Sequence, residues 1–189
     1  FYLALISKDS GDLDDGLSSF TSVANLNPYL AEAHISIGAF LHEQGQASAA
    51  VASLKKALSY QPNSAQALSN LGNSLCNLGD LEAAVNALQR AISIDPNYAE
   101  AHNNLGLALQ KTGNLSAAVS SFKTALQLKK RFPEALNNLG LTLQEKGEIN
   151  ILFGFICLNT HLVFTAAKGA IFFRMGIMNS FSLRSAKLE

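Results

Sequence analysis

The sequence predicts an all-α fold, a solenoid of stacked helix hairpins, and two observations support this prediction. The first is a period of 34 residues, which runs without insertion or deletion through residue 148. The second is that apolar residues within each period return at every third or fourth position, in two separate blocks. A fixed period of this length is typical of repeat architectures, in which each unit packs only on its neighbours.

Two columns of the repeat mark where helices end. Glycine follows the first block of each period, and glycine tolerates the left-handed backbone conformation that terminates a helix. The members of this column are Gly11, Gly45, Gly79, Gly113 and Gly147. Proline, which cannot continue a helix, follows the second block. It stands at Pro28, Pro62 and Pro96, and Lys130 takes the fourth place. Each unit is therefore expected to be a helix hairpin.

The expected helices follow in chain order. A partial unit comes first, with helices near residues 1–9 and 14–27. Three full hairpins then pair 31–44 with 48–61, 65–78 with 82–95, and 99–112 with 116–129. A final first helix covers 133–146, where Pro133 suits the first turn of a helix.

Small residues occupy further columns on both helices of the hairpin. On the first helix they are Gly38, Gly72, Gly106 and Gly140. On the second helix they are Ala50, Ala84 and Ala118, followed by Ala57, Ala91 and Ala125. A larger side chain at these positions would overpack the interface, so the helix axes are predicted to approach closely.

These columns resemble the signature of the tetratricopeptide repeat (TPR) family, which combines Leu-Gly, Tyr or Leu, Ala, Phe or Leu, Ala and Pro at this repeat length. The resemblance covers residues 1–148. It implies a right-handed superhelix of stacked helix pairs that serves as a protein-binding scaffold without a cofactor. It also implies an extended concave groove, lined by the first helix of each hairpin.

Asparagine recurs on the helices that are expected to line this groove. Asn70, Asn104 and Asn138 share one column, in which Ser36 takes the first place. Because an Asn amide both donates and accepts hydrogen bonds, such a row suits the backbone of an extended peptide. The row resembles the asparagine ladder in the repeat arm of O-linked N-acetylglucosamine transferases. Neighbouring columns add Asn73, Asn103 and Asn137, which are expected to support the ladder. The alternative interpretation is that Asn is a tolerated polar residue on a solvated face.

The expected rim of the groove is acidic, with Glu32, Glu100 and Glu134 in the column that also holds Gln66. TPR proteins that bind chaperone C-termini use Lys, Arg and Asn to clamp a carboxylate, and no cationic pair stands at these positions. We therefore expect no binding to an acidic chaperone tail. A neutral or mildly basic partner segment is favoured instead.

Composition and charge exclude several other classes. The 14 basic and 14 acidic side chains balance, which gives no support for nucleic-acid binding. Cys76 and Cys157 are too few and too far apart for a disulfide framework or a metal motif. A reducing compartment, the cytoplasm or nucleus, is therefore expected. The chain starts at Phe1, which resembles the middle of a helix, so we interpret the sequence as a fragment.

No combination of residues predicts catalysis. Phosphate-binding loops, nucleophile motifs and paired carboxylates are all missing from the sequence. His34 and His102 share a column with Leu68 and Leu136, which predicts a packing role rather than a metal ligand. His42 and Cys76 lie one period apart but have no third donor in their column. We therefore predict no metal site.

The tail from 149 to 189 departs from the repeat. Six of the 11 Phe residues lie there, and the only acidic residue is Glu189. Three interpretations stay open for it: a membrane span over 149–167, a divergent second helix that covers Leu139 and Leu143, or sequence that is not native to the family. The polar residues within 149–167 disfavour a span.

The sequence thus predicts a protein-interaction scaffold that binds an extended peptide segment in the concave groove. One alternative is the substrate-recruiting arm of a peptide O-glycosyltransferase whose catalytic domain lies outside this chain. The other alternative is a membrane-anchored scaffold. The sequence does not identify the partner.

Overall fold

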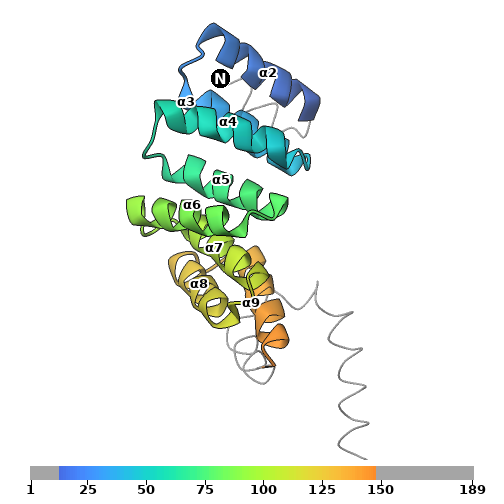
Figure 1. Cartoon of the computed structure of the whole chain (residues 1–189), viewed down its shortest axis with the longest axis vertical. Helices are drawn as coiled ribbons and strands as arrows, with labels where there is room; N and C mark the ends of the chain where they lie inside the picture. Colours follow the sequence, from blue (N-terminus) through green and yellow to red (C-terminus); the bar gives the residue numbers. More distant parts are fainter. Residues whose placement is uncertain (1–12, 148–189) are drawn as a thin grey trace, which may run out of the picture. The chain divides into compact units, whose positions relative to one another are not determined.

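The structure, a computed structural model, describes residues 13–147 (Figure 1). The chain divides into two compact units, Phe1–Gly147 and Glu148–Glu189, and the second unit lies outside the described residues. The described part is all-α, and no strand occurs in residues 13–147. Its helices are α2 (Leu13–Leu26), α3 (Ala31–Glu43), α4 (Ala47–Tyr60), α5 (Ala65–Leu78), α6 (Leu81–Ile94), α7 (Ala99–Lys111), α8 (Leu115–Leu128) and α9 (Pro133–Glu145).

The helices pair as the period predicts. The closest partners are α3 with α4, α5 with α6, and α7 with α8, and each hairpin then packs on the next one (Figure 1). The first helices α3, α5, α7 and α9 also contact one another in sequence. Within residues 13–147 no second helix contacts another second helix. The first helices of the helical repeat solenoid are therefore closer together than the second helices.

The glycine columns play the two roles that were predicted for them. Gly79 and Gly113 have φ angles of 84° and 81°, so each ends its first helix in the left-handed conformation. Gly106 lies instead within the hairpin interface. A Cβ atom added to it would lie 2.5 Å from Cε1 of Phe122. The prediction of close helix approach at this column is therefore confirmed.

The second helices begin and end one residue earlier than predicted, and two of them, α6 and α8, begin at a capping side chain. Asp80 and Asn114 directly follow the glycine turns, and each side chain accepts a hydrogen bond from a backbone N–H three residues later. A side-chain oxygen at the N-cap satisfies one of the donors that the first turn leaves without a partner. The helix therefore starts at Leu81 or Leu115, directly after its cap.

Several expectations lie outside the described residues. These are the helix at 1–9, the second-helix and non-native interpretations of the tail, the membrane span over 149–167, and the domain boundary after residue 148. Between residues 13 and 147, every helix is too short or too polar to span a bilayer.

Candidate functional site

The asparagine column lies along one face of the first helices. Asn70, Asn104 and Asn138 are half-buried and stand at equivalent positions on α5, α7 and α9. We call this surface the first-helix face. It consists of Asn70, Asn73, Asn104, Leu107, Asn138 and Leu141.

Two of the ladder asparagines are fixed by the preceding repeat. Nδ2 of Asn104 donates to Oγ of Ser69 at 3.2 Å, and Nδ2 of Asn138 donates to Oδ1 of Asn103 at 3.0 Å. Both acceptors are buried, because the side chains of Ser69 and Asn103 are 1% and 6% exposed. Each acceptor therefore lies beneath the ladder residue of the next repeat and binds its Nδ2, so that the amide oxygen points away from the acceptor.

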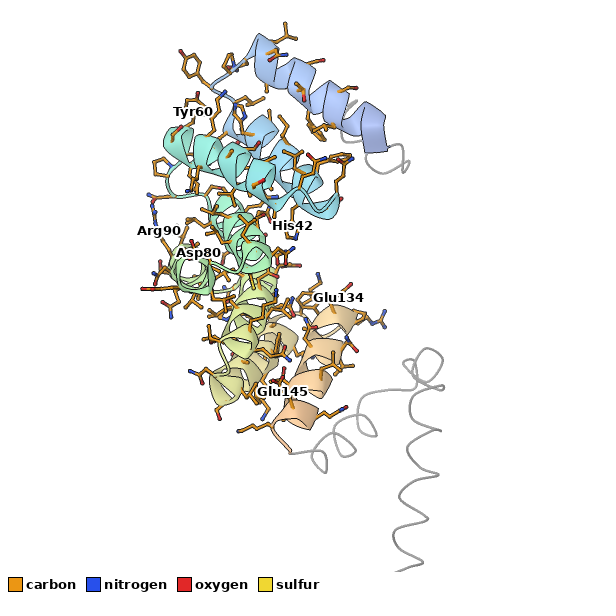
Figure 2. All side chains as sticks on the ribbon, turned by 45° about the vertical axis from the view of Figure 1, so that its right-hand side comes forward. His42, Tyr60, Asp80, Arg90, Glu134 and Glu145 are labelled. Atoms are coloured by element: carbon orange, nitrogen blue, oxygen red, sulfur yellow. The ribbon has the colours of Figure 1, made fainter. Side chains whose placement is uncertain are left out.

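Asn73 is held in the same way by His42, which lies where α3 meets α5 (Figure 2). Nδ2 of Asn73 contacts Nε2 of His42 at 3.0 Å, and an amide nitrogen can only donate. The neutral imidazole must therefore accept at Nε2 and carry its proton on Nδ1, which lies 3.1 Å from Oγ of Ser74. The Ser74 hydroxyl in turn donates to the carbonyl of Asn70.

Burial lowers the pKa of His42, and the nearby Glu43 carboxylate opposes this effect only in part. The depressed pKa is consistent with a neutral ring, because protonation would place a second donor opposite Nδ2 of Asn73.

These contacts leave three amide oxygens available. Oδ1 of Asn73, Asn104 and Asn138 has no hydrogen-bond partner within residues 13–147. No unpartnered side-chain nitrogen or oxygen is buried in that range, so each of these oxygens reaches solvent. Asn70 differs, because the column that supplies Ser69 and Asn103 holds the buried apolar Ile35 in the preceding repeat. Both polar atoms of the Asn70 amide are therefore without a partner in the described part of the chain.

The structure brings most of the predicted residues together but gives them different surroundings. Asn103 is buried beneath Asn138, so it supports the ladder from below and does not face solvent. Asn137 occupies the equivalent position on α9 and is exposed. The apolar side chains of Leu107 and Leu141 lie beside the ladder, and Leu141 is 51% exposed.

The acidic rim is only partly free. Nζ of Lys129 lies 2.6 Å from Oε1 of Glu100 and 4.5 Å above the ring of Phe132. Burial acts to raise the pKa of the Glu100 carboxyl. Hydrogen bonds from Lys129 and from the Glu100 backbone N–H, together with the positive charge of Lys129, outweigh burial, so the pKa is lowered. Glu32 and Glu134 are exposed, so they supply most of the accessible negative charge on this rim.

The histidines at the repeat junctions each contact a backbone carbonyl of the turn that precedes their helix. Nε2 of His34 lies 2.9 Å from the carbonyl oxygen of Pro28, and Nε2 of His102 lies 3.0 Å from that of Pro96. Leu68 stands in the same column of the intervening repeat, where Arg90 donates to the carbonyl of Pro62 at 2.9 Å (Figure 2). No group of His, Cys, Asp and Glu side chains suited to a metal ion occurs in residues 13–147.

Comparison with protein families identifies the repeat. The TPR repeat model matches residues 38–79, 72–113 and 111–147, which together make up more than half of the chain. The chain belongs to the TPR repeat family. TPR proteins are generally non-catalytic scaffolds that bind other proteins.

Solved TPR structures share this fold. MamA is 27% identical, with a TM-score of 0.66 over 80% of this chain and 89% of its own. TTC0263, a thermophilic TPR protein in Thermus thermophilus, is 20% identical, with a TM-score of 0.77 over 94% of this chain and 96% of its own. YrrB, a TPR protein with an unusual peptide-binding site, is 24% identical, with a TM-score of 0.59 over 77% of this chain and 75% of its own. No match to this chain was found among curated protein sequences.

The sequence predicts a supporting role for Asn103, one of the three residues that hold these asparagines, but not for the other two, Ser69 and His42. Ser69–Asn104 and Asn103–Asn138 are each separated by 35 residues, one period plus one position. A comparison of columns at that offset pairs Asn104 and Asn138 with their acceptors.

Proposed function

We propose that this TPR chain binds an extended segment of a partner polypeptide on the first-helix face, along the concave side of the solenoid. Asn70, Asn104 and Asn138 make the main contacts with the backbone of that segment. Asn73 and Asn137 add contacts at the same face, and Asn103 supports Asn138 from below.

The observation that carries this proposal is the equivalent position of three asparagines on successive first helices. Their amide oxygens reach solvent, so each can accept a hydrogen bond from a peptide. An extended backbone offers the same polar groups whatever its side chains, which suits a row of identical acceptors. Leu107 and Leu141 provide apolar surface for the side chains of the bound segment.

Two further points agree with this proposal. TPR proteins generally bind proteins, and YrrB has a peptide-binding site on the same fold. The exposed Glu32 and Glu134 favour a neutral or mildly basic segment and disfavour an acidic chaperone tail. We expect a Kd in the micromolar range, about −8 kcal/mol, because the contacts are few and individually weak.

The test is a binding measurement on the full chain. Peptides are first selected from a random display library, and the affinity of the best one is measured by fluorescence anisotropy. The Asn70/Asn104/Asn138→Ala variant is expected to weaken binding strongly. A matched variant, Asn63/Asn86/Asn97→Ala, makes the same chemical change at exposed positions in turns and on a second helix and is expected to bind normally. Equal affinity of the two variants would reject the proposal.

The closer resemblance to the repeat arm of peptide O-glycosyltransferases stays a prediction. It rests on the same three asparagines, and a glycosyltransferase domain encoded downstream in the full gene would support it.

A further inference from the structure

We propose that His42, Ser69 and Asn103 are positioning residues that give the first-helix face a single hydrogen-bonding polarity. Each accepts a hydrogen bond from the amide nitrogen of an asparagine in the next repeat, so the amide oxygen of that asparagine points outward. The face then presents a row of acceptors, which selects backbone N–H donors in its ligand. This inference rests on the proposed function for its ligand, but the orientation itself is testable without one.

The argument starts from the geometry of the amide group. An Asn side chain carries its donor and its acceptor on one planar carbon, so fixing one atom fixes the direction of the other. In Asn73, Asn104 and Asn138 the fixed atom is Nδ2, at 3.0, 3.2 and 3.0 Å from its acceptor. In all three the remaining oxygen reaches solvent.

The acceptors are held firmly enough to impose this direction. Ser69 and Asn103 are buried, and moving either one would disturb the packing between successive first helices. His42 is held by Ser74, whose hydroxyl also donates to the backbone of α5. Reversing the amide of Asn73 would place its oxygen against the unprotonated Nε2 of His42, and reversing that of Asn138 would place its oxygen against Oδ1 of Asn103, and each change costs free energy. The Ser69 hydroxyl can donate as well as accept, so at Asn104 the direction is the one set by the observed donation from Nδ2.

Asn70 provides a control within the chain. Ile35 stands where Ser69 and Asn103 stand in later repeats, so nothing comparable orients the amide of Asn70. The Asn70 amide can therefore point either its oxygen or its nitrogen toward solvent. The face should present only the amide oxygen at Asn104 and Asn138, but either atom at Asn70.

The first experiment needs no ligand and uses residues that the chain already places in this column. Exchange of the side-chain amide protons is measured by NMR on the full chain. In the wild type, the amide protons of Asn104 and Asn138 are expected to exchange more slowly than those of Asn70, because a hydrogen bond protects them. Asn103→Ile is expected to abolish the protection at Asn138, and Asn103→Ser to retain it. Ile35→Asn is expected to create protection at Asn70.

Equal exchange at Asn70 and Asn138 in the wild type would overturn the proposal, whether or not a peptide binds. So would unchanged protection at Asn138 in Asn103→Ile. If Asn103→Ile does not fold, the Ile35→Asn variant provides the test. The absence of exchange protection at Asn70 in that variant would reject the proposal.

The second experiment uses the selected peptide and analogues in which one backbone amide at a time becomes an ester, which removes an N–H. Where that N–H faces the ladder, the wild type is expected to lose affinity about tenfold, the value of one hydrogen bond near the upper end of its usual range. At the position that faces Asn138, Asn103→Ile should bind amide and ester with similar affinity, while Asn103→Ser keeps the preference. A merely structural role would change both affinities together.

The outcomes separate the two proposals. If the asparagine-to-alanine triple variant loses binding but no ester analogue does, the acceptor polarity is wrong and the proposed function stands. If the triple variant binds normally, the proposed function fails, and the selection of N–H donors by this face fails with it.

Discussion

The absence of a side chain at Gly106 allows the two helices of its hairpin, α7 and α8, to pack closely. The residue is buried, and the ring of Phe122 on α8 occupies the space where a side chain would begin. Gly38 and Gly72 stand in the same relation to Leu54 and Leu88 in the earlier repeats. A Cβ atom at any of these positions would force a buried, well-packed side chain to move.

We predict that Gly106→Ala lowers the free energy of unfolding by roughly 1–2 kcal/mol. Overpacking costs about 1–3 kcal/mol, and the higher helix propensity of Ala returns up to about 1 kcal/mol. Chemical denaturation measures the change. In a Phe122→Ala background the clash is absent, so the same substitution should instead stabilise. Destabilisation of equal size in both backgrounds would contradict this account.

His42 links a single protonation to the junction between two repeats. Its ring lies between α3 and α5 and contacts Asn73 and Ser74. Among the helices packed against α3, α5 carries no charged residue, α4 carries Lys55 and Lys56, and α2 carries Asp14 and Asp15. Glu43 is the charged group that acts on the ring, and it raises the pKa less than burial lowers it.

We predict that acid weakens the fold through His42. Because its pKa in the folded chain lies below the ordinary value of 6.5, the unfolded chain binds the proton first as the pH falls. The contribution of the neutral ring is complete above pH 6.5 and is lost progressively below it. Denaturation at a series of pH values, wild type against His42→Gln, should show a steeper loss in the wild type. A pKa at or above 6.5 by NMR titration would disprove the prediction.

At the scale of the element, the first turn of each second helix depends on its cap. Asp80 and Asn114 each accept a backbone N–H at 3.3 Å, whereas Gln46 caps α4 without any side-chain hydrogen bond to the helix. The three positions are equivalent in the repeat, so the chain itself provides capped and uncapped versions of one structure.

We predict that Asp80→Ala and Asn114→Ala each reduce stability by about 1 kcal/mol, the usual value of a lost N-cap. Gln46→Ala should change stability little, because no cap bond is lost. Thermal unfolding of the three single variants makes the comparison. A loss in Gln46→Ala as large as in the other two would show that capping is not the cause.

At the scale of the whole molecule, polar contacts join successive first helices. Besides Ser69–Asn104 and Asn103–Asn138, Lys111 donates to the carbonyl of Cys76 and Gln110 donates to Glu145. All four pairs are 35 residues apart. These bonds lie on the same helices as the proposed ligand contacts, so the register between repeats and the layout of the binding face are set together.

We predict that the charge of the rim selects the partner. Glu32→Lys/Glu134→Lys should reverse the preference of the full chain from mildly basic toward acidic peptides, because both side chains are exposed in the first turn of a first helix. The preference should shrink at high salt. Glu82→Lys, an exposed carboxylate on the second helix α6, is the control and should leave the preference unchanged. Binding of basic and acidic peptides of equal length, measured at two salt concentrations, provides the test.

The hairpins, their order and the turns that end them could all be predicted from the amino-acid sequence. These features depend on local physics that is repeated every 34 residues: helical spacing, left-handed glycine after the first helix, and proline after the second. The expected helix bounds are within one residue of the observed ones, and each second helix starts two residues after its glycine, at Ala47, Leu81 and Leu115.

In contrast, only the folded chain shows which asparagine amides are held by hydrogen bonds and which is not. The column identified Asn70, Asn104 and Asn138 as equivalent, but it could not distinguish the free amide of Asn70 from the two that are held. That difference comes from Ile35, Ser69 and Asn103 in the preceding repeats, which reach the ladder only once the first helices stack. Hydrogen-bond direction is set by the partner across the interface, and that partner lies a full repeat away in the chain.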